Sequence, residues 1–277
     1  MDVLRLAAFS DGSVGGNPAG VMIADALPDA DTMQSVAADV GYSETAFAAP
    51  DGEAWRVRYF APAMEVPFCG HATIALGAAL ARSKGDGVYT LNLNEAVISV
   101  EGRRDGDLFT GALQSPPTKS EPADPALVNE ILALLGYTSS DLDPRLSPTL
   151  ANAGATHLIL GLRDRAKLAA MDYDLEAGRA LMNAAGLVTI ALIVTESDRL
   201  FHARNAFASG GVLEDPATGA AAAAFAGALR DLGWPHGGAI DIVQGEDMGM
   251  RSRLHAEIPS EAGASIRVSG TARLMEA

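Results

Sequence analysis

The chain has 277 residues, enough for one large or two ordinary domains, and its formal net charge is −15. This acidic balance argues against a nucleic-acid or anionic-membrane partner, because both require basic surfaces. The single cysteine excludes an internal disulfide bond and a zinc site of four thiolates. We expect neither a signal peptide nor a membrane span, because no basic segment precedes an apolar run and no run reaches about 18 apolar residues. A cytoplasmic location is the expectation that remains.

Apolar periodicity and helix-stop signals divide the chain into strands and helices. The predicted strands are 3–9, 21–24, 45–49, 55–61, 88–92, 96–101, 108–114, 149–151, 156–162, 188–195, 200–207, 240–244, 253–257 and 265–269. The predicted helices are 31–40, 74–81, 125–135, 164–171, 175–185 and 220–229. Because strands alternate with helices but also follow one another as hairpins, the sequence predicts an α+β fold with mixed or mainly antiparallel sheets.

Two of these helices are apolar on every side, which places them inside a domain. The turn Cys69-Gly70-His71 leads into 74–81, and the turn Glu214-Asp215-Pro216-Ala217-Thr218-Gly219 leads into 220–229. The two arrangements lie roughly half a chain apart, which predicts two like domains, since solenoid repeats have periods of about 20–50 residues. Free backbone N–H groups at the start of each helix favour the binding of an anion.

Two other segments contain turn-forming residues. Ser10–Gly20 is rich in glycine but lacks the spacings of phosphate-binding loops, so nucleotide binding is disfavoured. Ser115–Pro122 holds three prolines in eight residues and is the predicted linker between the domains.

Each polar residue near the turns has a structural and a functional interpretation. Cys69 is either a buried, inert thiol or a thiolate that acts as base or nucleophile. His71 is either a satisfied core histidine or a neutral hydrogen-bonding group at the helix start. Asp215 is explained by the role of helix N-cap, with Pro216 at the first helical position. Glu44, which precedes the strand 45–49, is by itself an ordinary solvated glutamate.

Six short segments together resemble the PhzF-like (phenazine biosynthesis-like) isomerase family, which belongs with diaminopimelate epimerase and proline racemase in one superfamily. The segments are Gly16-Asn17-Pro18, Ser43-Glu44-Thr45-Ala46-Phe47, Arg58-Tyr59-Phe60-Ala61-Pro62-Ala63-Met64-Glu65, Cys69-Gly70-His71-Ala72-Thr73, Glu214-Asp215-Pro216-Ala217-Thr218-Gly219 and Gln244-Gly245-Glu246-Asp247-Met248-Gly249. The resemblance covers nearly the whole chain and is much less specific for a substrate than for the family.

The resemblance implies two pseudo-symmetric domains, each a mixed or mainly antiparallel sheet wrapped around a central buried helix. Residues 1–115 would form the first domain, with the C-terminal strand 268–277 as a candidate to complete it, and 116–267 the second. The substrate would bind between the two domains.

The resemblance also gives roles to individual residues. Glu44 occupies the position of the family's proton-transferring glutamate, and His71 and Asp215 occupy those of its polar partners. The substrate-binding residues that it implies are Asn17, Cys69, Gly70, Ala72, Thr218, Gly219 and Ala220. Cys69 matches the first thiol of the two-cysteine epimerases, whose second thiol corresponds to Asp215. Ala220 departs from the family pattern, in which a serine is common.

The sequence therefore predicts a cofactor-independent isomerase that moves a proton on a small carboxylate-bearing substrate. No cofactor is expected, and no metal, because Glu44, Glu65, His71 and Asp215 form no recognised ligand spacing. A homodimer is left open as the oligomeric state. Two alternatives remain: an amino-acid racemase or epimerase that uses Cys69 and Asp215, and a small-ligand binding protein of the same fold that catalyses nothing.

Overall fold

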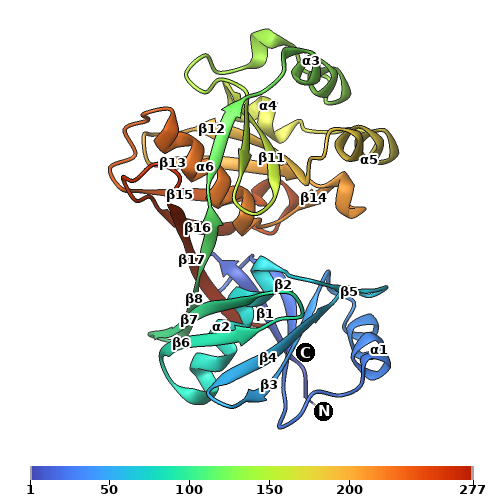
Figure 1. Cartoon of the computed structure of the whole chain (residues 1–277). Helices are drawn as coiled ribbons and strands as arrows, with labels where there is room; N and C mark the ends of the chain where they lie inside the picture. Colours follow the sequence, from blue (N-terminus) through green and yellow to red (C-terminus); the bar gives the residue numbers. More distant parts are fainter. Residues whose placement is uncertain (1, 276–277) are drawn as a thin grey trace. The chain divides into compact units, whose positions relative to one another are not determined.

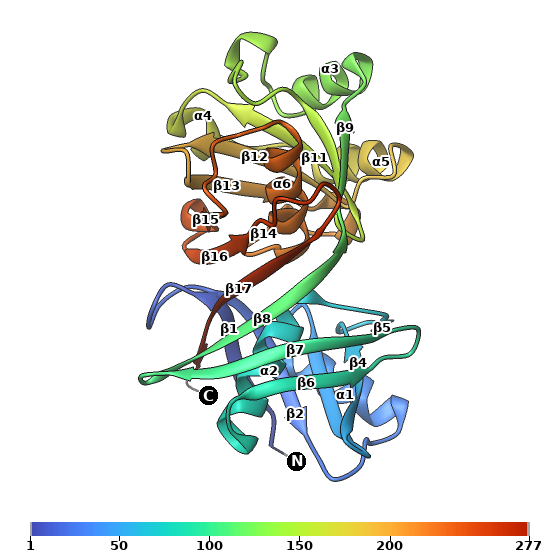
Figure 2. The ribbon, with the colours of Figure 1, turned by 60° about the vertical axis from the view of Figure 1, so that its left-hand side comes forward.

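The chain forms two compact units in the computed structural model, which describes residues 2–275 (Figure 1). The first unit contains the residues up to Gln114 and those from Ser269 onward, and the second contains Ser115–Val268. The chain passes between the units within strand β8 (Leu108–Pro117) and again within β17 (Ser265–Leu274), and these two strands pair (Figure 2). Residue 1 of the predicted domain 1–115 and residues 276–277 of the predicted strand 268–277 lie outside the described residues.

The first unit is a sheet wrapped around helix α2 (Gly70–Lys84). Its other elements are β1 (Leu4–Ser10), β2 (Asn17–Ile23), α1 (Ala30–Val40), β3 (Thr45–Asp51), β4 (Ala54–Phe60), β5 (Glu65–Val66), β6 (Gly87–Asn92) and β7 (Val97–Asp105). The strand order is β17-β1-β2-β3-β4-β6-β7-β8, and the pairing of β8 with β17 joins its ends. β2–β3 and β4–β6 are parallel, and the other pairs from β1 to β8 are antiparallel.

Small residues allow the sheet to approach α2 closely. A Cβ atom added to Gly102 of β7 would lie 2.1 Å from the carbonyl oxygen of Gly77 in α2, and one added to Gly111 of β8 would lie 2.6 Å from that of Ile74. Every residue of α2 from His71 to Ala81 is buried. The prediction that this apolar helix lies inside a domain is confirmed.

The second unit repeats this arrangement around α6 (Gly219–Asp231). Its strands are β9 (Lys119–Pro122), β10 (Thr149–Asn152), β11 (Thr156–Leu162), β12 (Thr189–Thr195), β13 (Leu200–Ala206), β14 (Glu214–Asp215), β15 (Ala239–Gln244) and β16 (Ser252–Glu257). Its other helices are α3 (Pro125–Leu134), α4 (Arg165–Ala169) and α5 (Leu175–Ala184), with 3-10 turns at Ser139–Asp141, Ala208–Gly210 and Glu246–Met248. The order is β9-β10-β11-β12-β13-β15-β16, in which β11–β12 and β13–β15 are parallel.

The two units share one connectivity. In each, a parallel strand pair is joined through outer helices, α1 in the first unit and α4 with α5 in the second, and a second parallel pair is joined through the central helix. The outer helices pack on the sheet face opposite the central helix, as the buried leucines of α3, α4, β11 and β12 show in the second unit. The predicted fold class is therefore confirmed.

The predicted linker begins at the boundary between the two units. Ser115–Pro122 contains the end of β8 and all of β9. The backbone of β9 pairs antiparallel with β10, from Lys119 opposite Asn152 to Pro122 opposite Thr149. This long-range pairing holds the segment extended.

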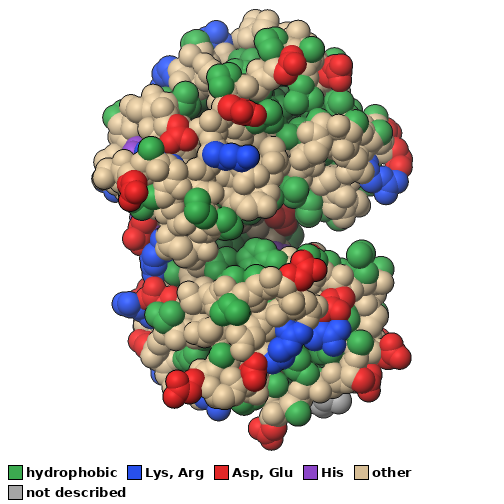
Figure 3. Space-filling view, in the orientation of Figure 1, with side chains coloured by type: hydrophobic (Ala, Val, Ile, Leu, Met, Phe, Trp, Pro, Cys, Tyr) green, Lys and Arg blue, Asp and Glu red, His purple; other side chains and the backbone are tan. Residues whose placement is uncertain are grey.

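The surface carries charged side chains of both signs. Acidic and basic side chains are interspersed over the face shown in Figure 3, without an extended basic area on that face. Among residues 2–275, no helix has the length and apolar character needed to cross a membrane.

Candidate functional site

An ion pair fixes the turn that precedes α2. Arg58 of β4 donates two hydrogen bonds to the Glu65 carboxylate of β5, with Nε–Oε1 and Nη2–Oε2 distances of 2.8 and 2.6 Å. These hydrogen bonds lower the pKa of Glu65, so the carboxylate stays ionised. The two-residue strand β5 is thereby held against β4, and the chain is directed toward the start of the central helix.

Buried hydroxyl groups then position the first turn of α2. Thr73 Oγ1 donates to the carbonyl oxygen of Cys69 at 2.7 Å and accepts a hydrogen bond from the Tyr59 hydroxyl, also at 2.7 Å. Burial raises the pKa of Tyr59, so the neutral phenol is the donor. Cys69 is the N-cap residue, but its side chain makes no capping hydrogen bond. The side chain of Cys69 therefore does not cap the N–H groups at the start of α2. An anion-binding site at a helix start requires such groups.

Four side chains gather at this helix start. The Glu44 carboxylate lies 3.4 Å from His71 Nε2, and the Ser43 hydroxyl lies 3.4 Å from the same nitrogen. Cys69 Sγ lies 3.3 Å from the other ring nitrogen, Nδ1. The side chain of Glu44 is 20% exposed and that of His71 8% exposed, so a small molecule can reach the carboxylate more readily than the imidazole.

This arrangement can accept, hold and return a proton. A carboxylate and an imidazole in contact form an acid–base pair, since either can carry the proton that the other gives up. The structure brings together Glu44, Cys69 and His71, which the sequence singled out separately. It adds Ser43, an exposed serine whose only signal in the sequence was its place in the segment Ser43-Glu44-Thr45.

The second unit has a matching ion pair. Arg204 of β13 contacts the Glu214 carboxylate of β14 through Nε at 3.1 Å and Nη2 at 2.5 Å, as Arg58 contacts Glu65. Arg204 also donates to the carbonyl oxygens of Leu168 and Ala169. Both side chains are more buried here, at 12% and 5% exposure, than in the first unit. The same device therefore positions the turn before each central helix.

Gln244 organises the turn before α6. Its Nε2 donates to the backbone carbonyl of Asp215 at 2.7 Å and to Thr218 Oγ1 at 3.2 Å, and its Oε1 accepts from the Thr218 N–H at 3.3 Å. The Thr218 hydroxyl in turn donates a short hydrogen bond to the Asp215 carboxylate. Gly245 is required next to Gln244, because a Cβ atom there would lie 2.8 Å from the carbonyl oxygen of Pro216. Gln244 was not among the predicted site residues, although it opens one of the family-like segments.

The N-cap interpretation of Asp215 is wrong. The residue lies in β14, paired with Asn205, and α6 begins only at Gly219 with Thr218 as its N-cap. Pro216 consequently precedes the helix and is not at its first position. The carboxylate of Asp215 accepts from Thr218, so it supports the turn without capping the helix.

The other predicted site residues occupy different surroundings. Asn17 is buried at the first position of β2, opposite Ala8 of β1. Gly70 opens α2 and is half-buried, whereas Ala72 is fully buried and offers no surface to a ligand. Gly219 and Ala220 open α6 and are half-buried.

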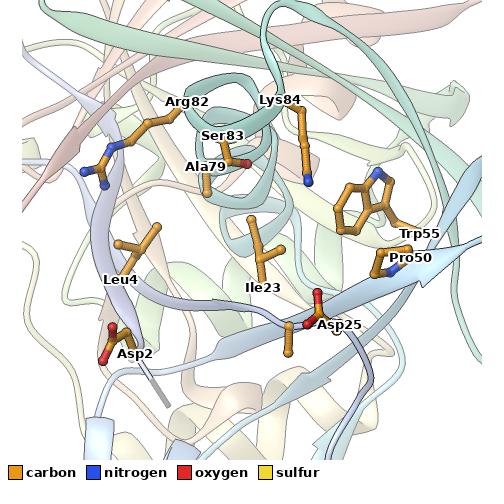
Figure 4. Close-up of a pocket in the computed structure, with 11 residues that line it drawn as sticks. Asp2, Leu4, Ile23, Asp25, Pro50, Trp55, Ala79, Arg82, Ser83 and Lys84 are labelled. Carbon is orange, nitrogen blue, oxygen red and sulfur yellow. The ribbon is translucent and has the colours of Figure 1, made fainter.

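A separate pocket of about 530 Å³ lies at the C-terminal end of α2 (Figure 4). Its wall carries Trp55 with the Lys84 ammonium 5.8 Å from the ring centroid. Leu4, Ile23 and Ala79 form its apolar part. None of the predicted site residues lines it.

The two units have the same connectivity around a buried helix, and in the first unit a glutamate and a histidine are in contact at the start of that helix. The family model described as phenazine biosynthesis-like protein matches residues 6–277. The chain belongs to this family and is an isomerase of the PhzF-like type.

Two curated relatives match this chain over nearly its whole length. Trans-2,3-dihydro-3-hydroxyanthranilate isomerase of Pseudomonas aeruginosa is 31% identical over 271 residues, which cover 95% of this chain and 93% of the relative. An uncharacterized isomerase of Mesorhizobium japonicum is 29% identical over 283 residues, with 95% and 93% covered.

Solved structures show the fold. A PhzF-family phenazine biosynthesis protein of Bacillus anthracis has a TM-score of 0.85 at 22% identity, covering 99% of this chain and 96% of that one. A probable proline racemase of Agrobacterium radiobacter has a TM-score of 0.65 at 12% identity, with 99% and 92% covered. The fold of this chain is therefore similar to those of PhzF-family and racemase-type proteins.

Proposed function

We propose that this isomerase is cofactor-independent and moves a proton on a small carboxylate-bearing substrate, with Glu44 as the proton-transferring base. The observation that carries the proposal is the 3.4 Å contact between the Glu44 carboxylate and His71 Nε2 at the start of α2. His71 holds the carboxylate in place and exchanges the proton with it, while the partly exposed carboxylate faces the substrate carbon. A base so placed contributes about 10²–10⁴-fold to the rate.

The start of α2 also supplies a candidate carboxylate site. The backbone N–H groups of Gly70 and His71 carry the positive end of the helix dipole and are close in sequence to the acid–base pair. A substrate carboxylate bound there would place its neighbouring carbon within reach of Glu44. For Asp215, the role of orienting the substrate and handling its polar groups stays a prediction. The same holds for the binding of the substrate by Thr218, Gly219 and Ala220.

The relative from Pseudomonas aeruginosa suggests the first compound to test. Its name identifies trans-2,3-dihydro-3-hydroxyanthranilate as the substrate of that enzyme, and an anthranilate carries the carboxylate that our proposal requires. The test is proton NMR of this compound, and of a panel of small cyclic and amino-acid carboxylates, with the purified chain in D₂O. We expect loss of a carbon-bound proton signal together with conversion of one compound in the panel. Tight binding of a compound that is neither exchanged nor converted would favour the binding-protein alternative.

One observation favours a second candidate function, an amino-acid racemase or epimerase. Cys69 Sγ lies 3.3 Å from His71 Nδ1, a contact through which an imidazole can activate a thiol. In that mechanism Cys69 and Asp215 would be the two bases. Inversion of an amino acid that requires the thiol of Cys69 would identify this function and exclude Glu44 as the main base.

A further inference from the structure

Three potential metal ligands converge beside the start of α2. One carboxylate oxygen of Glu44, Sγ of Cys69 and one ring nitrogen of His71 all lie within 4.8 Å of one another. Across residues 2–275, no other three His, Cys, Asp or Glu side chains come together in this way. Ligand spacing in the sequence did not predict the group, because Glu44 precedes β3, whereas Cys69 is the N-cap of α2 and His71 is its second residue.

The separation between His71 and Glu44 is that of a tetrahedral zinc site, and the separation between His71 and Cys69 is longer. Bond lengths of about 2.0–2.2 Å to nitrogen and oxygen and about 2.3 Å to sulfur give separations of about 3.4 Å between N and O and about 3.6 Å between N and S. The structure has 3.4 Å between His71 Nε2 and Glu44 Oε2, and 4.0 Å between His71 Nε2 and Cys69 Sγ. Cys69 Sγ lies nearer the other ring nitrogen, Nδ1, at 3.3 Å, so the Cys69 side chain has to turn toward Nε2 before one ion can contact all three donors.

The chemistry of the three donors also suits one class of ion. A thiolate, an imidazole and a carboxylate are ligands of zinc in proteins, and a thiolate with a carboxylate balances the charge of a divalent ion. Calcium and magnesium require oxygen ligands, which this group supplies only through Glu44. Glu44 is partly exposed and Ser43 is exposed, so an ion can enter, and water or the Ser43 hydroxyl can take the fourth position.

We propose that Glu44, Cys69 and His71 bind Zn²⁺ or a similar borderline-soft divalent ion, and that the bound ion inhibits the isomerase. A carboxylate that donates its electron pair to the ion can no longer accept a proton from the substrate. The inhibition rests on the proposed function of Glu44, whereas the binding of the ion does not. The site would make the activity sensitive to free zinc and restorable by a chelator.

Cobalt(II) is the probe for binding, because a bond between Co²⁺ and a thiolate gives an intense near-ultraviolet charge-transfer absorption. The chain has one cysteine, so this absorption can come only from Cys69. We expect the absorption when Co²⁺ is added to the whole chain, and its loss when Zn²⁺ displaces Co²⁺. Cys69→Ser should abolish it and weaken Zn²⁺ binding in calorimetry by more than the ~10–100-fold that loss of an outer-shell partner costs.

Two further variants make the test independent of one substitution. Glu44→Gln keeps the volume of the side chain and the thiol, so it should retain the absorption but bind Zn²⁺ at least ~10-fold more weakly. His202→Gln is the control, because His202 contacts the carboxylates of Glu196 and Glu246 elsewhere in the chain. This variant should bind Zn²⁺ as the wild type does.

The outcomes separate the two proposals. Absence of the charge-transfer absorption in a folded wild-type chain, or equal zinc affinity in Cys69→Ser, would overturn the metal site. Binding without any effect of Zn²⁺ on turnover would overturn the inhibition. A chain that binds Co²⁺ through Cys69 but shows no isomerase activity when metal-free would contradict the proposed function and leave the metal site standing.

Discussion

Thr218 occupies in the second unit the place that Cys69 occupies in the first. Each has an extended backbone, each is the N-cap residue of the central helix, and each is followed by the glycine that opens the helix. The ion pairs Arg58–Glu65 and Arg204–Glu214 fix this correspondence, because each joins the strand before the turn to the two-residue strand that leads into it. In this comparison, Asp215 corresponds to Val66. The N-cap residue of the central helix therefore carries a thiol in the first unit and a hydroxyl in the second.

The first prediction is that Cys69→Ser keeps at least a tenth of the wild-type turnover. The proposed base is Glu44, so the thiol is not needed for proton transfer, whereas the racemase alternative uses Cys69 and Asp215 as its two bases. The serine retains a small polar side chain, so a loss of at most about 1.4 kcal/mol in transition-state stabilisation is expected. The measurement is kcat in metal-free buffer. If kcat drops a thousandfold or more while the circular dichroism is unchanged, the racemase mechanism is the better account.

The second prediction concerns the ion pair of the second unit. Arg204→Met should lower the free energy of unfolding by about 3–5 kcal/mol, because it leaves the Glu214 carboxylate buried without its partner. Arg58→Met should cost less, since the side chains of Arg58 and Glu65 are 22% and 28% exposed and water can solvate the remaining carboxylate. Urea unfolding of both variants measures the difference.

A double variant controls for the loss of packing around Arg204. Arg204→Met combined with Glu214→Leu removes both charges and should recover a large part of the lost stability. Equal destabilisation in the single and the double variant would show that the unpaired carboxylate is not the cause.

The sequence predicted the central helices and most strands correctly because their signals are local. An apolar run that contains no charge until Arg82 has no solvent face wherever it folds, and α2 is buried as expected. The errors arose where a distant segment decides the local structure. Asp215 has the sequence of a helix cap. In the structure it lies in β14 and pairs with Asn205 of β13, and its carbonyl oxygen accepts a hydrogen bond from Gln244.

In the candidate site, too, the residues could be predicted from local signals, whereas their contacts depend on distant segments. Glu44, Cys69 and His71 could be selected from their segments and from the family resemblance, but their contact depends on how β3 and α2 pack. No local pattern fixes the 3.4 Å between two side chains that the chain brings together from different elements. The serine at position 43 was missed because an exposed serine next to a strand carries no signal of its own.

The third prediction concerns pH and the buried imidazole of His157. Its Nδ1 contacts Thr189 Oγ1 at 2.7 Å, and burial lowers the pKa of His157 from 6.5 to about 4. Well above pH 6.5 the imidazole is neutral in both the folded and the unfolded chain. Between pH 6.5 and about 4 the unfolded chain binds a proton that the folded chain does not, so stability falls as the pH falls.

The variant His157→Asn isolates this contribution, since an asparagine can still bond Thr189 but does not titrate. The wild type should lose about 3 kcal/mol more than the variant between pH 6.5 and 4. Carboxylates that titrate in the same range affect both proteins equally. Parallel curves of unfolding free energy against pH for the two proteins would show that His157 is not buried as a neutral group.

The most direct test of the central claim is the rate at which the chain exchanges a carbon-bound hydrogen of its substrate with D₂O. Glu44→Gln keeps the size and hydrogen bonding of the side chain but removes the base, and Glu53→Gln makes the same change at an exposed glutamate between β3 and β4. We predict that exchange falls at least ~100-fold in Glu44→Gln, with ligand affinity and melting temperature nearly unchanged, and is normal in Glu53→Gln. Exchange in Glu44→Gln within tenfold of the wild-type rate would contradict the account.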